Sequence, residues 1–324
     1  MNHSSLILQC DPESLARAAS MLREGKLVAF PTETVYGLGA DATNDRAVAA
    51  IYAAKGRPQF NPLIVHVAKI EALDSLIVWN AAARMLAEAV WPGPLTLVLP
   101  RHPHCPVSRL ASAGTETLAV RMPSHPVAQA LIERAGVPVA APSANASGKL
   151  SPTEAAHVAE SLVGAVDAII DGGRCAVGVE STVVSWLRHA PEILRPGGVP
   201  REQIEKILGR PVAVAELSAG EDSPAPSPGL LSSHYAPRAA LRLNALFAEG
   251  DEALLTFGED MHVKGGTLRL NLSPSGDVHE AAANLFAMLH RLDAAGVSRI
   301  AVMPIPEEGL GIAINDRLRR GAVR

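Results

Sequence analysis

The chain has 324 residues, of which 48 % are hydrophobic, so it is long enough for two domains with ordinary cores. A formal net charge of −4 and an aromatic content of only 3 % argue against a protein that coats nucleic acid by charge and base stacking. Three widely spaced cysteines, no long apolar run and no signal-peptide pattern at the N-terminus predict a cytoplasmic protein that does not contact a membrane.

Helical and extended patterns alternate over the first two thirds of the chain. Helices are expected where a capping residue or Pro precedes an Ala- and Leu-rich stretch, and strands where a short apolar run ends in Pro or Gly. The expected helices are residues 11–25, 44–55, 80–90, 124–136 (capped by Ser124), 151–163 (with a capping box at Ser151) and 201–208. The expected strands are 26–32, 62–67, 95–100, 117–123, 137–143, 167–171, 181–186 and 192–197. This alternation predicts an α/β domain.

The composition changes after residue 208. Residues 209–240 are rich in Pro, Ser, Gly and Ala, which indicates a linker, although it ends in His234 and Tyr235, an unusual pair for a simple spacer. Beyond it, strands are expected at 252–257, 267–272 and 299–304, and helices at 278–295 and 312–320. This pattern predicts a second, smaller, Rossmann-like α/β domain with a largely parallel sheet.

Familiar nucleotide and metal motifs are absent from the sequence. There is no P-loop, no GxGxxG after a strand, no HExxH and no CxxC. His102, His104 and Cys105 lie close together, but no fourth ligand is nearby, so a surface loop is favoured over a metal site. A nucleotide enzyme with this sequence must hold phosphate by another design.

A basic turn follows the helix at 44–55. Lys55 and Arg57 lie in the segment KGRP, where a tight Gly/Pro turn suits the binding of a polyphosphate. The alternative is that both cations complement the helix dipole and remain in solvent. The next strand carries His66, and a single His in such a strand is more often a core residue than a ligand.

Small polar residues follow two of the expected strands. Thr32 and Thr34 follow the first, and Ser143 and Asn145 follow the strand at 137–143. Ligands of α/β folds bind near strand ends, and small side chains let backbone N–H groups approach a phosphate. Ordinary solvated turns remain the alternative at both places.

Polar side chains also occur inside apolar strands, namely Arg121, Ser181 and Arg195. A charged side chain buried without a partner is costly, so each must be paired, solvated or in a cleft. Any one of them could form a structural ion pair. Three on neighbouring elements, beside the basic turn, indicate an anionic ligand.

Together these segments resemble one family. PTETVYGLGAD, KGRP, NPLIVH, VRMP, APSANASG, GVESTVV and ILRPG, in this order, are similar to the YrdC/Sua5 family of threonylcarbamoyl-AMP synthases. The linker and second domain resemble the longer, Sua5 type. The resemblance implies a catalytic domain with a twisted mixed sheet and flanking helices at 1–208, a linker or lid at 209–240 and a C-terminal domain at 241–324.

The resemblance also implies a reaction. A nucleotidyltransferase of this family converts L-threonine, bicarbonate and ATP, with Mg²⁺, into L-threonylcarbamoyl-AMP and pyrophosphate. A tRNA threonylcarbamoyl transferase then modifies adenosine 37 of tRNAs that read ANN codons. Weak contact with tRNA or double-stranded RNA remains open. No side chain is an obvious nucleophile, which fits catalysis by positioning and charge neutralisation.

The roles implied by the resemblance extend to single residues. Those expected to bind ATP are Lys55, Arg57, Asn61, Thr117, Ser143, Asn145, Ser151 and Arg195, with Tyr235 closing over the nucleotide, and Lys55 and Arg57 are the expected catalytic residues. Those expected to line the threonine pocket are Thr34, His66, Arg121, Ala141 and Ser181, with Arg121 facing the carboxylate. Contacts made by linker residues 230–233 are left open.

Two alternatives remain from the sequence. Larger carbamoyltransferases use the same domain type with carbamoyl phosphate, but they carry further catalytic modules that do not fit in 324 residues. The chain could also be an RNA-binding module that acts through a basic cleft, which would show a steep salt dependence of tRNA affinity and no ATP turnover.

Overall fold

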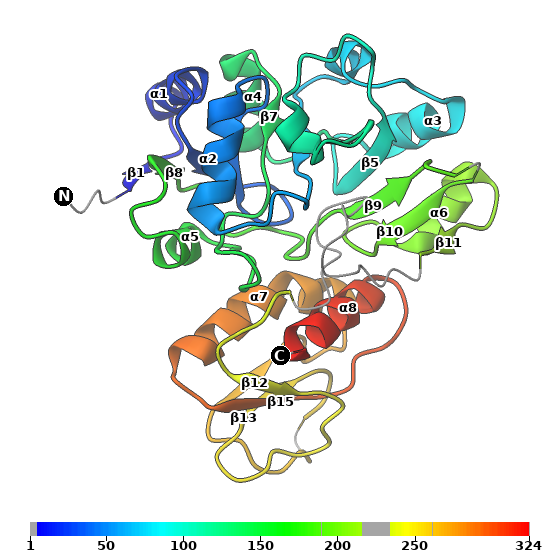
Figure 1. Cartoon of the computed structure of the whole chain (residues 1–324). Helices are drawn as coiled ribbons and strands as arrows, with labels where there is room; N and C mark the ends of the chain where they lie inside the picture. The colour runs from blue at the N-terminus through cyan, green and yellow to red at the C-terminus, as the bar shows by residue number, and fades with distance from the viewer. Residues whose placement is uncertain (1–4, 189, 216–233, 261, 324) are drawn as a thin grey trace.

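The computed structural model describes residues 5–188, 190–215, 234–260 and 262–323. These residues form a larger N-terminal body and a smaller C-terminal body stacked beneath it (Figure 1). The predicted fold class is confirmed, since one body contains a mixed sheet with flanking helices and the other a parallel sheet. Most of the predicted linker, including residues 230–233, lies outside the described residues.

The N-terminal body is organised around an 11-stranded sheet in the order β1-β8-β2-β3-β7-β4-β6-β5-β9-β10-β11. Its strands are β1 (Leu6–Leu8), β2 (Val28–Phe30), β3 (Gly37–Asp41), β4 (Ile64–His66), β5 (Leu95–Pro100), β6 (Thr117–Arg121), β7 (Val139–Ala140), β8 (Ala168–Ile170), β9 (Thr182–Ser185), β10 (Glu192–Arg195) and β11 (Ala213–Val214). The sheet is mixed: β4 pairs with β6 in parallel, and β5 pairs with β6 antiparallel. In this arrangement the C-terminal ends of β4 and β6 and the N-terminal end of β9 lie on the same side of the sheet.

Helices cover the two faces of this sheet. They are α1 (Pro12–Arg23), α2 (Asp45–Lys55), α3 (Ala81–Val90), α4 (Pro126–Ala135), α5 (Ala155–Ser161) and α6 (Arg201–Leu208), with short 3-10 helices at Ile70–Ser75 and Arg109–Ser112. Leu22 of α1 and Leu131 of α4 pack with Phe30 in one apolar cluster. Residues of α2, α3, α5 and α6 pack in a second, larger cluster.

Strand β3 was not expected, because residues 31–41 were interpreted as a turn. It pairs antiparallel with β2. Gly39 is required by this pairing, since a Cβ at this position would lie 2.7 Å from the Phe30 ring. Glycine is rare inside strands and weakens the strand pattern in a sequence, which hid this element. Thr32 and Thr34 therefore lie in the connection of a hairpin.

Two predicted helix starts were wrong. Helix α4 is capped by His125, not by Ser124, and the Val127 N–H donates to His125 Nδ1 at 3.2 Å. Helix α5 begins four residues later than expected because Ser151 does not form a capping box. The Ser151 hydroxyl donates instead to Glu180 Oε1 at 2.5 Å, and this side chain is fully buried.

The C-terminal body contains a four-stranded parallel sheet in the order β12-β15-β13-β14. Its elements are β12 (Ala240–Arg242), β13 (Ala253–Thr256), β14 (Arg269–Asn271), α7 (Val278–Ala294), β15 (Arg299–Val302) and α8 (Leu310–Ala322). Helices α7 and α8 lie between this sheet and the N-terminal body (Figure 1). Val35, Leu150 and Val179 share one apolar cluster with Phe286 and Ile314, so the two bodies are packed together. The domain limits 1–208, 209–240 and 241–324 remain a prediction.

A stacked histidine pair also joins the bodies. The rings of His157 on α5 and His290 on α7 lie 3.9 Å apart with an interplanar angle of 11°. His290 Nε2 lies 3.1 Å from the Ser151 carbonyl oxygen. Burial, followed by the charge of Arg174, lowers the pKa of His157 to about 4, and burial beside His157 lowers that of His290 to about 4. Both rings are therefore neutral near pH 7.

This pair predicts acid sensitivity of the folded state. The two histidines of the unfolded chain become protonated near pH 6.5, whereas in the folded chain their pKa values are lower. Their contribution to the free energy of unfolding is therefore complete above about pH 6.5 and is lost as the pH falls toward about 4. As the pH falls between these limits, the melting temperature of His290→Gln should drop less than that of the parent chain. His104→Gln, on an exposed loop, is the control, and equal losses in all three proteins would contradict the prediction.

None of the described helices is both long enough and apolar enough to cross a membrane.

Candidate functional site

A pocket lies where strand ends of the N-terminal sheet meet the residues that lead into the C-terminal body. Register places His66 of β4 beside Arg121 of β6, and Thr96 of β5 opposite Arg121. The predicted site residues that line this pocket are Thr34, Arg57, His66, Arg121, Ala141, Ser143, Ser181, Arg195 and Tyr235. Segments that are far apart in the sequence thus contribute to one cavity.

The basic turn is buried and does not extend into solvent. Lys55 Nζ donates to the Ser143 carbonyl at 2.5 Å and to that of Asn145. Arg57 donates from Nε to the Asn61 carbonyl at 3.1 Å and from Nη2 to the Pro62 carbonyl at 2.9 Å. Burial lowers the pKa of Lys55 well below its usual value and lowers that of Arg57 to about 10. An anion bound here would stabilise the charged forms of both side chains and so offset the cost of their burial.

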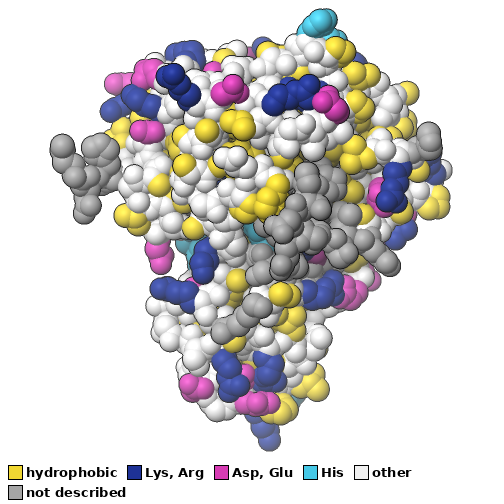
Figure 2. Space-filling view, viewed as in Figure 1, with side chains coloured by type: hydrophobic (Ala, Val, Ile, Leu, Met, Phe, Trp, Pro, Cys, Tyr) yellow, Lys and Arg dark blue, Asp and Glu magenta, His cyan; other side chains and the backbone are white. Residues whose placement is uncertain are grey.

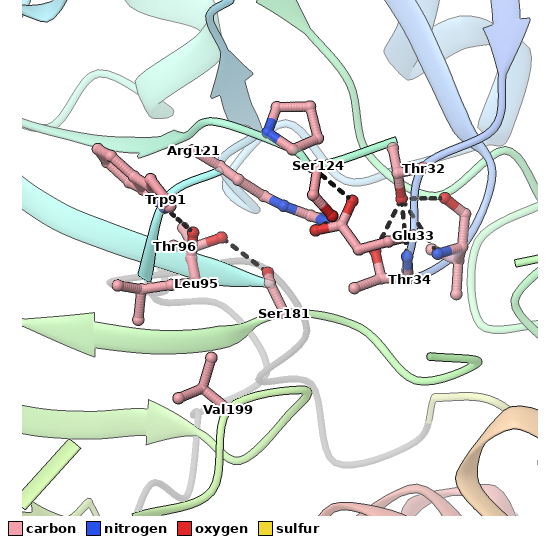
Figure 3. Close-up of polar contacts among 12 residues, drawn as sticks. Thr32, Glu33, Thr34, Trp91, Leu95, Thr96, Arg121, Ser124, Ser181 and Val199 are labelled. Atoms are coloured by element: carbon pink, nitrogen blue, oxygen red, sulfur yellow. Dashed lines mark hydrogen bonds and ion pairs between the residues drawn. The ribbon is translucent and has the colours of Figure 1, made fainter. Parts of the chain in front are cut away.

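A third cation comes from β10. Arg195 is 4 % exposed and donates from Nη2 to the Ser181 carbonyl at 2.9 Å and to its hydroxyl at 3.2 Å. The Ser181 and Thr96 hydroxyls lie 2.7 Å apart (Figure 3). The register of β9 and β10 shifts between Ile193 and Arg195, and such bulges re-aim side chains next to functional sites. These contacts hold the guanidinium at the pocket wall.

Arg121 is held in the pocket by a carboxylate that the sequence analysis did not select. Its Nη2 donates to Glu33 Oε1 at 2.7 Å, and both side chains are buried. Glu33 Oε2 accepts the Ser124 N–H at 3.0 Å (Figure 3). Its position between two threonines, directly after a buried strand, was the signal that could have identified it. This pair fixes the guanidinium, and Arg121 Nε finds no hydrogen-bond partner within the described part of the chain.

His66 is 2 % exposed, and its Nδ1 lies 3.2 Å from the Ile64 carbonyl oxygen. Burial, followed by the charge of Arg121, lowers its pKa to about 3. The ring is therefore neutral near pH 7 and can offer a hydrogen bond but no charge. It is buried in its strand, as such histidines commonly are, and it also lines the pocket.

Some predicted site residues lie beside the pocket or away from it. The Asn145 carbonyl accepts from Lys55, and its side-chain Nδ2 donates to the Ala146 and Lys149 carbonyls at 2.9 Å each. Thr117 is at the opposite end of β6 from Arg121, with its Oγ1 3.2 Å from that of Thr115, and is not among the lining residues. Its proposed role remains a prediction.

His234 and Tyr235 enter the pocket at the end of the predicted linker. Tyr235 is 2 % exposed and has a φ of 63°, a strained value for a residue other than glycine that is often found at ligand-binding sites. The next residue, Ala236, donates its N–H to the Gly148 carbonyl at 2.9 Å. Burial first, and then nearby cations that include Arg57, lower the pKa of His234 well below its usual value.

Buried polar atoms without a hydrogen-bond partner concentrate in this region. Within the described ranges they are Asn61 Nδ2 and Oδ1, Arg121 Nε, Asn145 Oδ1, Thr153 Oγ1, His234 Nδ1, the Tyr235 hydroxyl and Arg317 Nη2. Native interiors contain few such atoms, and each one needs an explanation such as a bound molecule. Most of these belong to residues in or beside the pocket, which indicates that the pocket accommodates a polar ligand.

No group of three or more His, Cys, Asp or Glu side chains that could hold a metal occurs among the described residues. Glu180, which lines the pocket, already pairs with Arg317 at 2.7 Å, and Glu33 pairs with the lining residue Arg121 at 2.7 Å. His102 and His104 lie in a loop, where the His104 N–H donates to His102 Nδ1 at 3.2 Å.

Comparison with known proteins finds similarity along almost the whole chain. The family model described as telomere recombination matches residues 20–197, and that described as threonylcarbamoyl-AMP synthase, C-terminal domain, matches residues 199–323. The chain is 44 % identical over 322 residues to the threonylcarbamoyl-AMP synthase of Pyrococcus abyssi, covering 94 % of this chain and 93 % of the relative. It is 44 % identical over 326 residues to that of Bacillus subtilis, covering 96 % and 93 %. It is also similar to a crystal structure of P. abyssi Sua5 complexed with L-threonine, with a TM-score of 0.89, 41 % identity and 98 % of each chain covered.

Proposed function

The chain belongs to the YrdC/Sua5 family of threonylcarbamoyl-AMP synthases and makes L-threonylcarbamoyl-AMP from L-threonine, bicarbonate and ATP for tRNA modification, and from this premise we propose that the pocket described above is its active site. The observation that carries the assignment is the gathering of Arg57, Arg121 and Arg195 around one buried cavity. Buried cations favour an anionic ligand, because such a ligand offsets the cost of their desolvation.

ATP is assigned to the side of the pocket that holds Lys55, Arg57 and Arg195. The turn after α2 would place two cations on the triphosphate, and Ser143 and Asn145 lie beside Lys55. Asn61, Thr117, Ser151 and Tyr235 are proposed as the remaining nucleotide-binding residues. Bringing these cations together before the substrate arrives neutralises phosphate charge without reorganisation during the reaction.

L-Threonine is assigned to the neighbouring side, with its carboxylate at Arg121. The bound threonine of the P. abyssi structure supports a threonine site in this fold. Thr34, His66, Ala141 and Ser181 would surround the rest of the substrate, as they line the same cavity. Glu33 would hold the Arg121 guanidinium in a fixed orientation, which leaves its Nε and remaining N–H groups for the substrate carboxylate.

The reaction then needs positioning more than a reactive side chain. The threonine amine and CO₂ derived from bicarbonate form a carbamate with loss of a proton, and a carbamate oxygen attacks the α-phosphorus as pyrophosphate leaves. Lys55, Arg57 and Arg195 stabilise the charge that develops on the phosphates. His234 and Tyr235 cover the cavity and exclude water from the short-lived carbamate.

Some expectations rest on the family alone. Mg²⁺ is proposed only as a companion of the ATP phosphates, and no step is assigned to it. Transfer of the product to a tRNA threonylcarbamoyl transferase, a cytoplasmic location and weak contact with tRNA or double-stranded RNA are likewise proposals. On the face shown in Figure 2, Lys and Arg are interspersed with Asp and Glu, which gives no support to a broad RNA-binding surface there.

The assay for this proposal is pyrophosphate release from ATP by the purified chain, with threonine and bicarbonate omitted in turn. We expect release only when both are present. Release that ignores threonine and accepts carbamoyl phosphate would favour the carbamoyltransferase alternative. No release from folded protein, combined with a steep salt dependence of tRNA affinity, would favour the RNA-binding alternative.

A further inference from the structure

The C-terminal body contributes a buried arginine to the boundary of the pocket. Arg317 lies on α8 and is 1 % exposed. Its Nε donates to Glu180 Oε2 at 2.7 Å and its Nη1 to Asp316 Oδ2 at 2.6 Å. Its guanidinium carbon lies 5.1 Å from the centre of the Tyr235 ring. One side chain therefore connects the last helix, the N-terminal body and the residue that covers the cavity.

Glu180 is the reason that this contact matters for the site. It lines the same cavity as Arg57 and Arg195, and its Oε1 accepts the Ser151 hydroxyl. Burial raises the pKa of Glu180, but the charges of Arg317 and Arg195 and its hydrogen bonds together lower this pKa by more. The net shift is downward, so the carboxylate is ionised. An ionised carboxylate without a partner would repel a bound triphosphate through a medium of low dielectric constant.

Helix α8 also lies directly against the residues that cover the pocket. The His234 N–H donates to the Arg320 carbonyl at 3.4 Å. A Cβ added at Gly321 would lie 2.9 Å from the Tyr235 carbonyl oxygen, so this glycine allows the close approach of the helix. Helix α8 thus contacts both the Glu180 carboxylate and Tyr235, two residues that line the same pocket.

We propose that Arg317 is a positioning residue through which the C-terminal body completes the ATP site. It neutralises Glu180, so that the cations of the pocket act on ATP without an opposing charge. Its guanidinium also supports the Tyr235 ring from the side of α8. This inference rests on the proposed assignment of ATP to the pocket, and it gives the C-terminal body a role in the reaction.

The test compares Arg317→Met with the double variant Arg317→Met/Glu180→Gln. The single variant should raise KM for ATP on the order of tenfold, with KM for threonine changed by less than about twofold, because Glu180 contacts Ser151 and lies near the charge of Arg195, both of which are assigned to the ATP side. The double variant should return KM for ATP to within about threefold of the parent value, since no carboxylate is left unpaired. Arg319→Met is the matched control, because this exposed arginine of the same helix pairs with Glu307 at 2.7 Å.

A role limited to docking the two bodies predicts a different result. In that case Arg317→Met would raise both KM values to a similar extent, and the second substitution would leave both raised, which would overturn the proposal. Arg317→Lys retains the charge and covers the case in which the methionine variant does not fold, and a KM for ATP near the parent value supports charge neutralisation. Calorimetric Kd values for ATP on the same proteins separate failure of this inference from failure of the proposed function, because they do not depend on turnover. Equal Kd values for parent and Arg317→Met would also overturn the proposal.

Discussion

Replacing Lys55 by methionine should lower the rate of threonine-dependent pyrophosphate release on the order of 100-fold or more, with little change in melting temperature. Lys55 is 3 % exposed, and its amine is held between the carbonyls of Ser143 and Asn145. Burial lowers its pKa, so the free enzyme bears the cost of holding this cation until phosphate binds. Methionine fills a similar volume without charge, and the fold therefore loses little.

Steady-state rates and thermal unfolding of the same preparations check this prediction. Arg57→Ala should behave similarly, because Arg57 lines the pocket and Lys55 donates to the carbonyl of Ser143, which also lines it. Lys69→Met is the matched control, since Lys69 is 67 % exposed and pairs with Glu133 at 2.8 Å away from the site. A Lys55→Met enzyme with the parent rate would remove this lysine from the mechanism.

Replacing Arg121 by lysine should raise KM for threonine on the order of 100-fold and leave KM for ATP almost unchanged. Lysine retains the positive charge beside Glu33 but lacks the planar fork that binds two carboxylates at once. In the parent chain one arm of that fork is bound by Glu33 at 2.7 Å. The remaining N–H groups would be those that bind the substrate carboxylate.

Kinetics with each substrate varied in turn distinguish this effect from general damage. Arg134→Lys, on the exposed side of α4, serves as the control. A rise in KM for ATP instead of threonine would mean that the two substrates were assigned to the wrong sides of the pocket. Equal rises for both would indicate that Arg121 supports the fold and does not select the substrate.

The sequence alone determined most of the local structure. Asn44, Asn80 and Gly56 mark ends of α2 and α3 where they were expected, because capping depends on neighbours within one turn. The roles of the glycines inside β3 and of the Ser151 hydroxyl were not predicted, because they depend on contacts outside the local sequence. What they contact, Phe30 and Glu180, lies at a distance along the chain that no local pattern reports.

The composition of the site was also largely determined by the sequence. Lys55, Arg57, Arg121 and Arg195 could be selected because a cation in an apolar strand or a tight turn is costly without a partner. The motif order was sufficient to indicate the family and its reaction. The reaction was implied by that resemblance to a known family.

The partners of these cations were decided by the tertiary structure. Glu33 pairs with Arg121 across 88 residues, and Glu180 pairs with Arg317 across 137. Arg317 lies on the buried face of α8 with Leu310, Ala313 and Ile314. This helical spacing indicates that Arg317 is buried, but it does not identify the residues that Arg317 contacts. The partner of a carboxylate cannot be read from the sequence, because the strength of an ion pair depends on the distance between the charges in space and on the loss of water around them.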